Sequence, residues 1–149
     1  MKTKLFLFTA AMLLFSGCTK RDGITVDDIY WFVETYTIRE NQWQLVNGVN
    51  QLNSYYQAQV NIPELDRKIY ESGNVFCYMY QNIDGTEVQT LLPFTLPVGI
   101  DNGDGTETLW TETYACDFSV GSVMFYVNYS DFITENKPKA TKFRVVLNY

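Results

Sequence analysis

The sequence contains no histidine, and this absence excludes several kinds of site together. A Ser-His-Asp triad, a Cys-His dyad, a His-Glu-x-x-His zinc site and an imidazole pH switch all need that side chain. The remaining chemistry comprises hydrolysis by paired carboxylates, a serine–lysine or tyrosine nucleophile, and a calcium site built from oxygen ligands. Because no nucleophile motif stands out either, we expect a protein without catalytic residues, cofactor or metal.

Basic side chains are also few, with 11 Lys and Arg against 17 Asp and Glu and a net charge of −6. The densest groups are Lys20 with Arg21 and, toward the C-terminus, Lys137, Lys139, Lys142 and Arg144. A surface that binds the phosphate backbone of a nucleic acid needs a denser cluster of Lys and Arg. The composition therefore predicts no nucleic-acid partner.

No apolar run is long enough to span a membrane. The longest covers residues 5–15, whereas a spanning helix needs roughly 20 residues. Lys2 and Lys4 precede this run, which is typical of a secretory signal, predicted here over residues 1–17. The following Ser16-Gly17-Cys18 completes a segment that resembles the lipobox of bacterial lipoproteins. This resemblance implies cleavage before Cys18 and a diacylglycerol on its thiol; the alternative is an ordinary signal peptide followed by a coincidental cysteine.

Removal of residues 1–17 would leave 132 residues, enough for one domain with its own core. It would also remove two lysines and no acidic residue, which lowers the net charge to −8. We expect residues 18–28 to be a lipidated N-terminus and tether, and residues 29–149 to be the folded domain. The predicted location is the cell envelope, with the protein anchored to the outer membrane by the lipid on Cys18 and its leaflet left open.

Period-two alternation of apolar residues dominates the folded part of the chain. Runs of this kind cover residues 29–38, 55–62, 74–81, 87–94, 110–118, 123–130 and 143–149. Turn signals such as Asn47-Gly48 and Asp84-Gly85 separate them. Pro93 and Pro97 are expected to end the strand over residues 87–94. Only residues 63–70, which begin with a proline and end near Gly73, predict a helix. The pattern predicts an all-β fold, an antiparallel immunoglobulin-like β-sandwich of about seven strands with one short helical crossover.

Two further cysteines, Cys77 and Cys116, each lie inside a predicted strand. An exported protein reaches an oxidising compartment in which a disulfide persists. A buried free cysteine also behaves as a small hydrophobic residue and is common in cores. Both interpretations stay open, while a metal role is disfavoured because two thiols have no histidine to join them.

Several segments resemble a known group of proteins. The lipobox, the segment Ser72-Gly73-Asn74-Val75, the pair Leu92-Pro93 and the terminal 143–147 segment are similar to small Bacteroidetes lipoproteins of uncharacterised function. The resemblance implies an immunoglobulin-like β-sandwich at the cell envelope. It implies no functional residues.

Acidic residues form two patterns that could carry chemistry. Asp101, Asn102, Asp104 and Glu107 suggest a calcium loop, but an EF-type spacing would put Ile100 at the first ligand position, so a hairpin turn is favoured. Glu34, Glu112 and Asp117 lie in apolar strands. We interpret Glu112, which shares a face with Trp110 and Tyr114, as an edge-strand charge that discourages aggregation. The alternative is a carboxylate-based glycan hydrolase that uses Glu112.

Aromatic residues are abundant, at 16% of the chain. Four of them border polar or turn segments and are predicted to lie near the surface as ligand-binding rings: Trp43, Tyr55, Tyr56 and Tyr149. Exposed rings stack on sugars or anchor protein partners. The favoured function is a non-catalytic binding or accessory module for a glycan or an envelope protein. The alternative is a structural or adhesive component that assembles by strand addition through its C-terminal strand.

Overall fold

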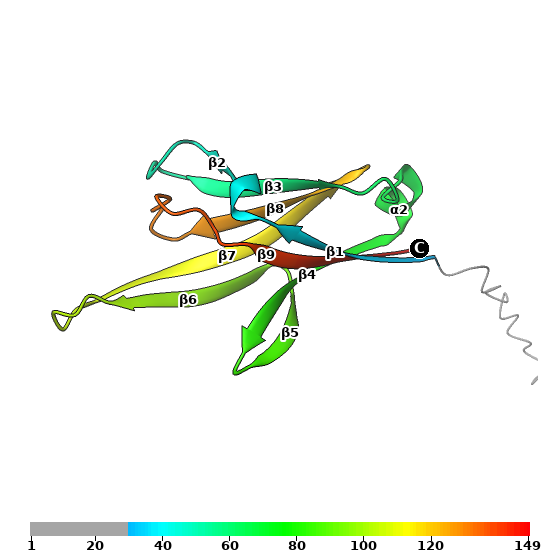
Figure 1. Cartoon of the computed structure of the whole chain (residues 1–149). Coiled ribbons are helices and arrows are strands. Elements are labelled where there is room, and N and C mark those ends of the chain that lie inside the picture. Colours follow the sequence, from blue (N-terminus) through cyan, green and yellow to red (C-terminus); the bar gives the residue numbers. More distant parts are fainter. Residues whose placement is uncertain (1–29) are drawn as a thin grey trace, which may run out of the picture.

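A computed structural model describes residues 30–149, which form two packed antiparallel sheets (Figure 1). Sheet A has the order β1-β9-β4-β5 and sheet B the order β2-β3-β8-β7-β6. The strands of sheet A are β1 (Trp31–Ile38), β9 (Thr141–Asn148), β4 (Asn74–Ile83) and β5 (Thr86–Leu91). Those of sheet B are β2 (Gln44–Val46), β3 (Tyr55–Asn61), β8 (Ser122–Tyr129), β7 (Glu107–Ser119) and β6 (Phe94–Asp101). Two short helices complete the described chain, η1 (Glu40–Gln42) and α2 (Arg67–Ser72).

The predicted all-β sandwich with one short α-helical crossover is confirmed, and the described strands number nine instead of seven. The two additional strands are β2, which has three residues, and β6. In the immunoglobulin order the last strand lies in a different sheet from the first. Here β9 lies beside β1 and β4 within sheet A, so the resemblance to that fold concerns the two-sheet architecture and not the order of the strands.

The core forms where the inner faces of the two sheets meet. Phe125 on β8 stacks against Phe143 on β9 with ring centroids 4.2 Å apart, and Trp43 meets Phe143 edge-on at 6.3 Å. All three side chains are at most 1% exposed. The alternation of buried and less buried residues along β8 and β9 produces this interface because successive side chains of a strand point to opposite faces.

The crossover helix α2 begins later than the sequence predicts. Residues 63–66 form a turn, and Asp66 is the N-cap, whose side chain accepts a hydrogen bond of 2.8 Å from the amide of Ile69. An N-cap carboxylate satisfies one of the free amides of a first helical turn, which explains why the helix starts after Asp66 and not at Pro63. Within the described residues, no helix is both long and apolar enough to cross a membrane.

The strand β6 was not predicted, because Pro93 and Pro97 suggested that the preceding strand ended there. β6 instead pairs with β7 along its whole length, with Pro97 opposite Thr111. Proline is tolerated at this position because β6 is the edge of sheet B, where a missing amide breaks no ladder bond on the free side.

The C-terminal strand β9 has no free edge. It pairs with β1 on one side and with β4 on the other, and Phe143, Val145 and Leu147 are fully buried. The expectation that this strand offers its edge to a neighbouring molecule is therefore wrong. Strand addition would need one of the outer strands of the two sheets instead.

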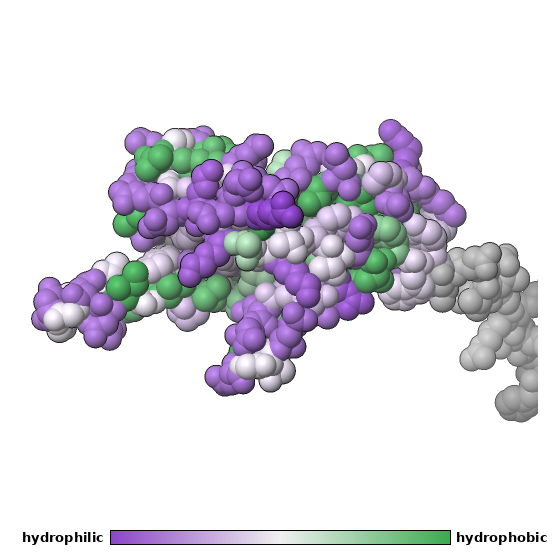
Figure 2. All heavy atoms as spheres, viewed as in Figure 1, coloured by the Kyte–Doolittle hydropathy of each residue, from purple (hydrophilic) through white to green (hydrophobic). Residues whose placement is uncertain are grey.

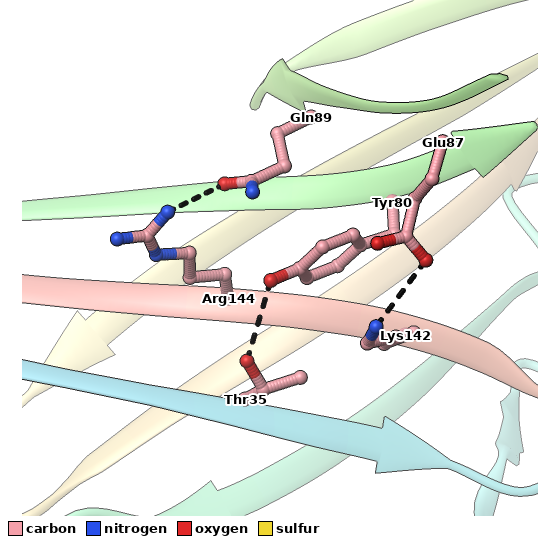
Figure 3. A network of polar contacts seen from close by, with 6 residues as sticks. All are labelled: Thr35, Tyr80, Glu87, Gln89, Lys142 and Arg144. Carbon is pink, nitrogen blue, oxygen red and sulfur yellow. Dashed lines mark hydrogen bonds and ion pairs between the residues drawn. The ribbon is translucent and has the colours of Figure 1, made fainter.

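The outer face of sheet A carries a polar network that crosses all four strands (Figure 3). Lys142 on β9 contacts Glu87 on β5 at 3.3 Å and lies 3.9 Å above the ring of Tyr80 on β4. Arg144 donates a hydrogen bond of 2.8 Å to Gln89, and the hydroxyls of Tyr80 and Thr35 are 3.4 Å apart. Two of the predicted C-terminal basic residues are thus engaged within sheet A.

The two central hairpins diverge from each other. Figure 1 shows the β6–β7 hairpin extending beyond the rest of the sandwich, while the end of the β4–β5 hairpin points in another direction. β8 pairs with β7 only from Glu112 onward, so the part of β7 before Glu112 belongs to a two-stranded arm. Figure 2 shows apolar side chains along this arm and a hydrophilic tip; Ile100 and Leu109 are 54% and 71% exposed. This divergence leaves part of the inner face of sheet B uncovered.

Candidate binding cleft

A cleft lies over the uncovered inner face of the β6–β7 hairpin, and we call it the hairpin cleft. Leu96 on β6 pairs with Glu112 on β7, and Val98 pairs with Trp110. These four side chains lie on the same face of sheet B as the buried Tyr129 of β8, which is opposite Glu112. The face continues the core pattern of sheet B past the end of sheet A. Side chains that would be core residues elsewhere are therefore accessible from solvent.

Two cavities make up the hairpin cleft. The first encloses about 570 Å³, and its floor is formed by β6 and β7 while its wall is the β8–β9 connection. The second, of about 530 Å³, lies between the same strands and the β4–β5 hairpin, and its lining includes Met79 and Gln81. Four residues line both cavities: Leu96, Glu112, Tyr114 and Thr141. Cavities of this size accommodate small organic ligands.

Glu112 and Tyr114 form the polar centre of the cleft. The Tyr114 hydroxyl donates a hydrogen bond of 3.0 Å to Oε2 of Glu112. Burial, together with the charge of Glu112 and this bond, raises the pKa of Tyr114 well above its ordinary value. Burial and the same carboxylate also raise the pKa of Tyr129. Both phenols therefore stay protonated at neutral pH; Tyr114 donates its hydrogen bond to Glu112, and the hydroxyl of Tyr129 can donate to another group.

The first cavity mixes rings with charges of both signs. Half-buried Trp110 and buried Tyr129 line it together with the acidic Glu112 and Asp131 and the exposed Lys137 and Lys139. An apolar surface with a few polar groups around it is the usual form of a small-molecule site.

The β8–β9 connection that walls the cleft is anchored through Thr134, which is 1% exposed. Its amide donates a bond of 2.8 Å to Oδ1 of Asn50, and its hydroxyl accepts one of 3.0 Å from the Asn50 amide. The Tyr56 hydroxyl donates a bond of 2.7 Å to the Thr134 carbonyl. These three bonds hold the wall against β3 and the β2–β3 loop.

The four rings predicted to bind a ligand do not line the hairpin cleft. The prediction that Trp43 and Tyr56 lie near the surface is wrong, because they are 1% and 2% exposed. Trp43 fills the core beneath Phe143, and Tyr56 points inward from β3 to hold Thr134. Tyr55 is half-buried and meets Tyr126 edge-on at 5.8 Å.

Tyr149 is 46% exposed, with the Lys68 ammonium 3.7 Å from the centre of its ring. It lines a separate and smaller hollow of about 290 Å³ beside α2, together with Tyr30 and Pro63. Of the four predicted rings, only Tyr149 is strongly exposed, and its ring already contacts a cation of the same chain.

The aromatic residues that line the cleft are Trp110, Tyr114 and Tyr129, and the strand pattern of the sequence does not distinguish them from core residues. The signal that could have identified them is the alternation of Phe94, Leu96, Val98 and Ile100 just before the turn at 101–105. This run indicates a strand opposite β7. Because Pro97 concealed that strand, the length of the hairpin and its accessible face were missed.

The three strand carboxylates lie in different environments. Glu34 lies on the edge strand β1 and accepts a 2.7 Å bond from Tyr36. The interpretation of Glu112 as an edge-strand charge is wrong, because β7 runs between β8 and β6. Asp117 lies on the opposite face of β7 from Glu112 and accepts a bond of 2.9 Å from Tyr126.

The acidic segment at 101–107 is the turn of the β6–β7 hairpin, as predicted. Asp101 accepts a hydrogen bond of 2.8 Å from the Gly103 amide, and Asp104 accepts one of 2.9 Å from the Thr106 amide. The Thr106 hydroxyl donates to the same Asp104 oxygen, and these two bonds from Thr106, that of the hydroxyl first, hold the pKa of Asp104 below its ordinary value. Within residues 30–149, no group of three or more acidic or cysteine side chains is placed to hold a metal ion.

Cys77 and Cys116 come together across the interior as free thiols, Cys77 from β4 and Cys116 from β7.

Cys18 and the predicted signal and tether lie outside the described residues. Comparison with protein-family models, curated proteins and solved structures found no match. The resemblance to Bacteroidetes lipoproteins therefore stays a prediction.

Proposed function

We propose that this protein is a non-catalytic binding module of the bacterial cell envelope that holds a glycan in the hairpin cleft. The observation that carries this proposal is the uncovered inner face of the β6–β7 hairpin, where Trp110 and the hydrogen-bonded pair Tyr114 and Glu112 line one continuous opening. A sugar presents both an apolar C–H face and a rim of hydroxyls. Rings beside fixed donors and acceptors match both features.

The mixed charge of the cleft supports a neutral glycan over a strongly charged ligand. Glu112 and Asp131 face the same cavity as Lys137 and Lys139. Charges of both signs disfavour a polyanion, and they offer acceptors and donors to hydroxyl groups. The cleft is also bounded on several sides, unlike the flatter surfaces typical of protein partners.

The location is part of the same proposal. The predicted signal and the lipobox-like segment support attachment to the outer membrane through a lipid on Cys18. Mass spectrometry of the protein isolated from its native membrane would identify the N-terminal residue. An acylated Cys18 at the N-terminus supports the anchor, and an unmodified residue at the start of the mature chain contradicts it.

The binding proposal is tested by calorimetric titration of the protein with a panel of neutral envelope and dietary oligosaccharides. Trp110→Ala should weaken affinity by about 30-fold, which corresponds to a contact worth about 2 kcal/mol. The matched control is Trp31→Ala, because Trp31 is 60% exposed on the outer face of sheet A and far from the cleft. Equal affinity of Trp110→Ala and wild type, or no binding across the panel, would refute the proposal.

The non-catalytic part is tested with the same oligosaccharides. We expect no change in their chain length after long incubation with the protein. Release of shorter sugars by the wild type and its loss in Glu112→Gln would instead identify a carboxylate-based hydrolase.

A further inference from the structure

Cys77 and Cys116 occupy facing positions in the two sheets. Cys77 lies on β4 opposite Val145, and Cys116 lies on β7 opposite Phe125. Val145 and Phe125 are fully buried, so both thiols point into the space between the sheets. Cys77 itself is 3% exposed, and Cys116 is half-buried at the margin of the same cluster.

Each thiol affects the ionisation of the other. The Cys77 thiol, acting as a donor, favours the thiolate of Cys116 and lowers the pKa of Cys116, despite the opposing effect of burial. The nearby Cys116 thiol and burial both raise the pKa of Cys77. Cys116 is therefore the thiol that ionises first, and its partial exposure gives an oxidant access to it.

We propose that Cys77 and Cys116 form a disulfide that joins the two sheets in the exported protein. The Cys116 thiolate attacks one sulfur of an oxidant disulfide, either a small-molecule disulfide or that of a thiol–disulfide oxidoreductase, and releases the other sulfur as a thiolate. Cys77 then loses its proton and attacks the Cys116 sulfur of the mixed disulfide. The Cys77–Cys116 bond forms, and the oxidant leaves as two thiols that carry the two protons.

The bridge would lie at the closed end of the hairpin cleft. Cys116, Tyr114 and Glu112 share the inner face of β7, and Met79, two residues beyond Cys77, lines the second cavity. Beyond this point the hairpins diverge. A covalent link here would fix the separation of β4 and β7 at the place where the cleft begins. It would also close a long loop in the unfolded chain, and such loops give a disulfide its largest effect on stability.

The test uses the full chain, purified with its thiols reduced and then incubated folded with oxidised glutathione. Non-reducing peptide mapping should find residues 77 and 116 in one linked pair, with neither available for alkylation after denaturation. Subsequent reduction should lower Tm by roughly 10 °C. The double variant Cys77→Ala/Cys116→Ala is the control, and its Tm should be the same in both buffers.

Three results would overturn the proposal. Alkylation of both thiols in the denatured, unreduced protein would show that no bond had formed. Glutathione retained on Cys116 would show that Cys77 cannot reach it. A bond from either residue to Cys18 or to another chain would assign the thiols to a different partner. Mapping of the wild-type chain decides among these results even where the double variant does not fold.

Discussion

Replacement of Tyr56 by phenylalanine tests whether this ring is structural or ligand-binding. Tyr56 is 2% exposed, and its hydroxyl donates a bond of 2.7 Å to the carbonyl of Thr134, which is itself 1% exposed. Tyr56→Phe keeps the ring in contact with Tyr129 but leaves the carbonyl without this donor. A buried group that loses its partner costs about 1 to 3 kcal/mol, so we expect the free energy of unfolding to fall by about 2 kcal/mol.

Urea unfolding measures this change, with tryptophan fluorescence as a probe, to which the buried Trp43 contributes. For a slope of about 1 to 3 kcal/mol per molar urea, the midpoint should fall by roughly 1 M. Hydrogen exchange gives a second readout, because the Thr134 amide is bonded to Asn50 and should exchange faster once the wall is loosened.

The matched control is Tyr55→Phe on the same strand. The Tyr55 ring is half-buried against Tyr126, and its hydroxyl has no hydrogen-bond partner among the described residues. We expect a change within about 0.5 kcal/mol for this control. Equal midpoints for Tyr56→Phe and Tyr55→Phe would refute the structural role assigned to the Tyr56 hydroxyl.

Three further predictions concern the core, a close approach and the response to pH. Phe143→Ala should destabilise the fold by about 3 to 5 kcal/mol, because the ring is fully buried against Phe125; chemical denaturation measures this, and a loss below about 1 kcal/mol would contradict the packing. Gly73→Ala should lower the free energy of unfolding by about 2 kcal/mol, since its Cβ would lie 2.6 Å from the Asn148 carbonyl oxygen. Thermal unfolding measures this change, and an unchanged Tm would show that β9 can move away without loss of stability. Burial and the bond to Asp117 raise the pKa of Tyr126 to about 12. The folded state thus retains this proton where the unfolded chain loses it, and stability should fall as pH rises from about 10 to about 12. The urea midpoint of Tyr126→Phe should therefore fall less over this pH range than that of the wild type. Parallel pH profiles of the two proteins would contradict this role of Tyr126.

Local patterns determined the elements of this protein. Alternation in 123–130 and 143–149 predicts β8 and β9 because the period of two is a property of an extended chain and requires no partner. The turn at 101–105 is equally local, since Asp101 and Asp104 bond to amides two residues away. Sequence reasoning could therefore predict two-sheet packing and the crossover helix.

Tertiary structure alone decided which residues are accessible and which meet. Trp43 borders a turn in the sequence yet lies beneath Phe143, because burial depends on what packs above a side chain and not on its neighbours along the chain. Trp110 and Tyr114 belong to a strand pattern that predicts a core, and they are accessible because sheet A ends before the β6–β7 hairpin does. The meeting of Cys77 with Cys116 likewise requires two strands from different sheets to face each other. Each of these outcomes depends on the relative positions of distant segments, which the periodicity within a single segment does not encode.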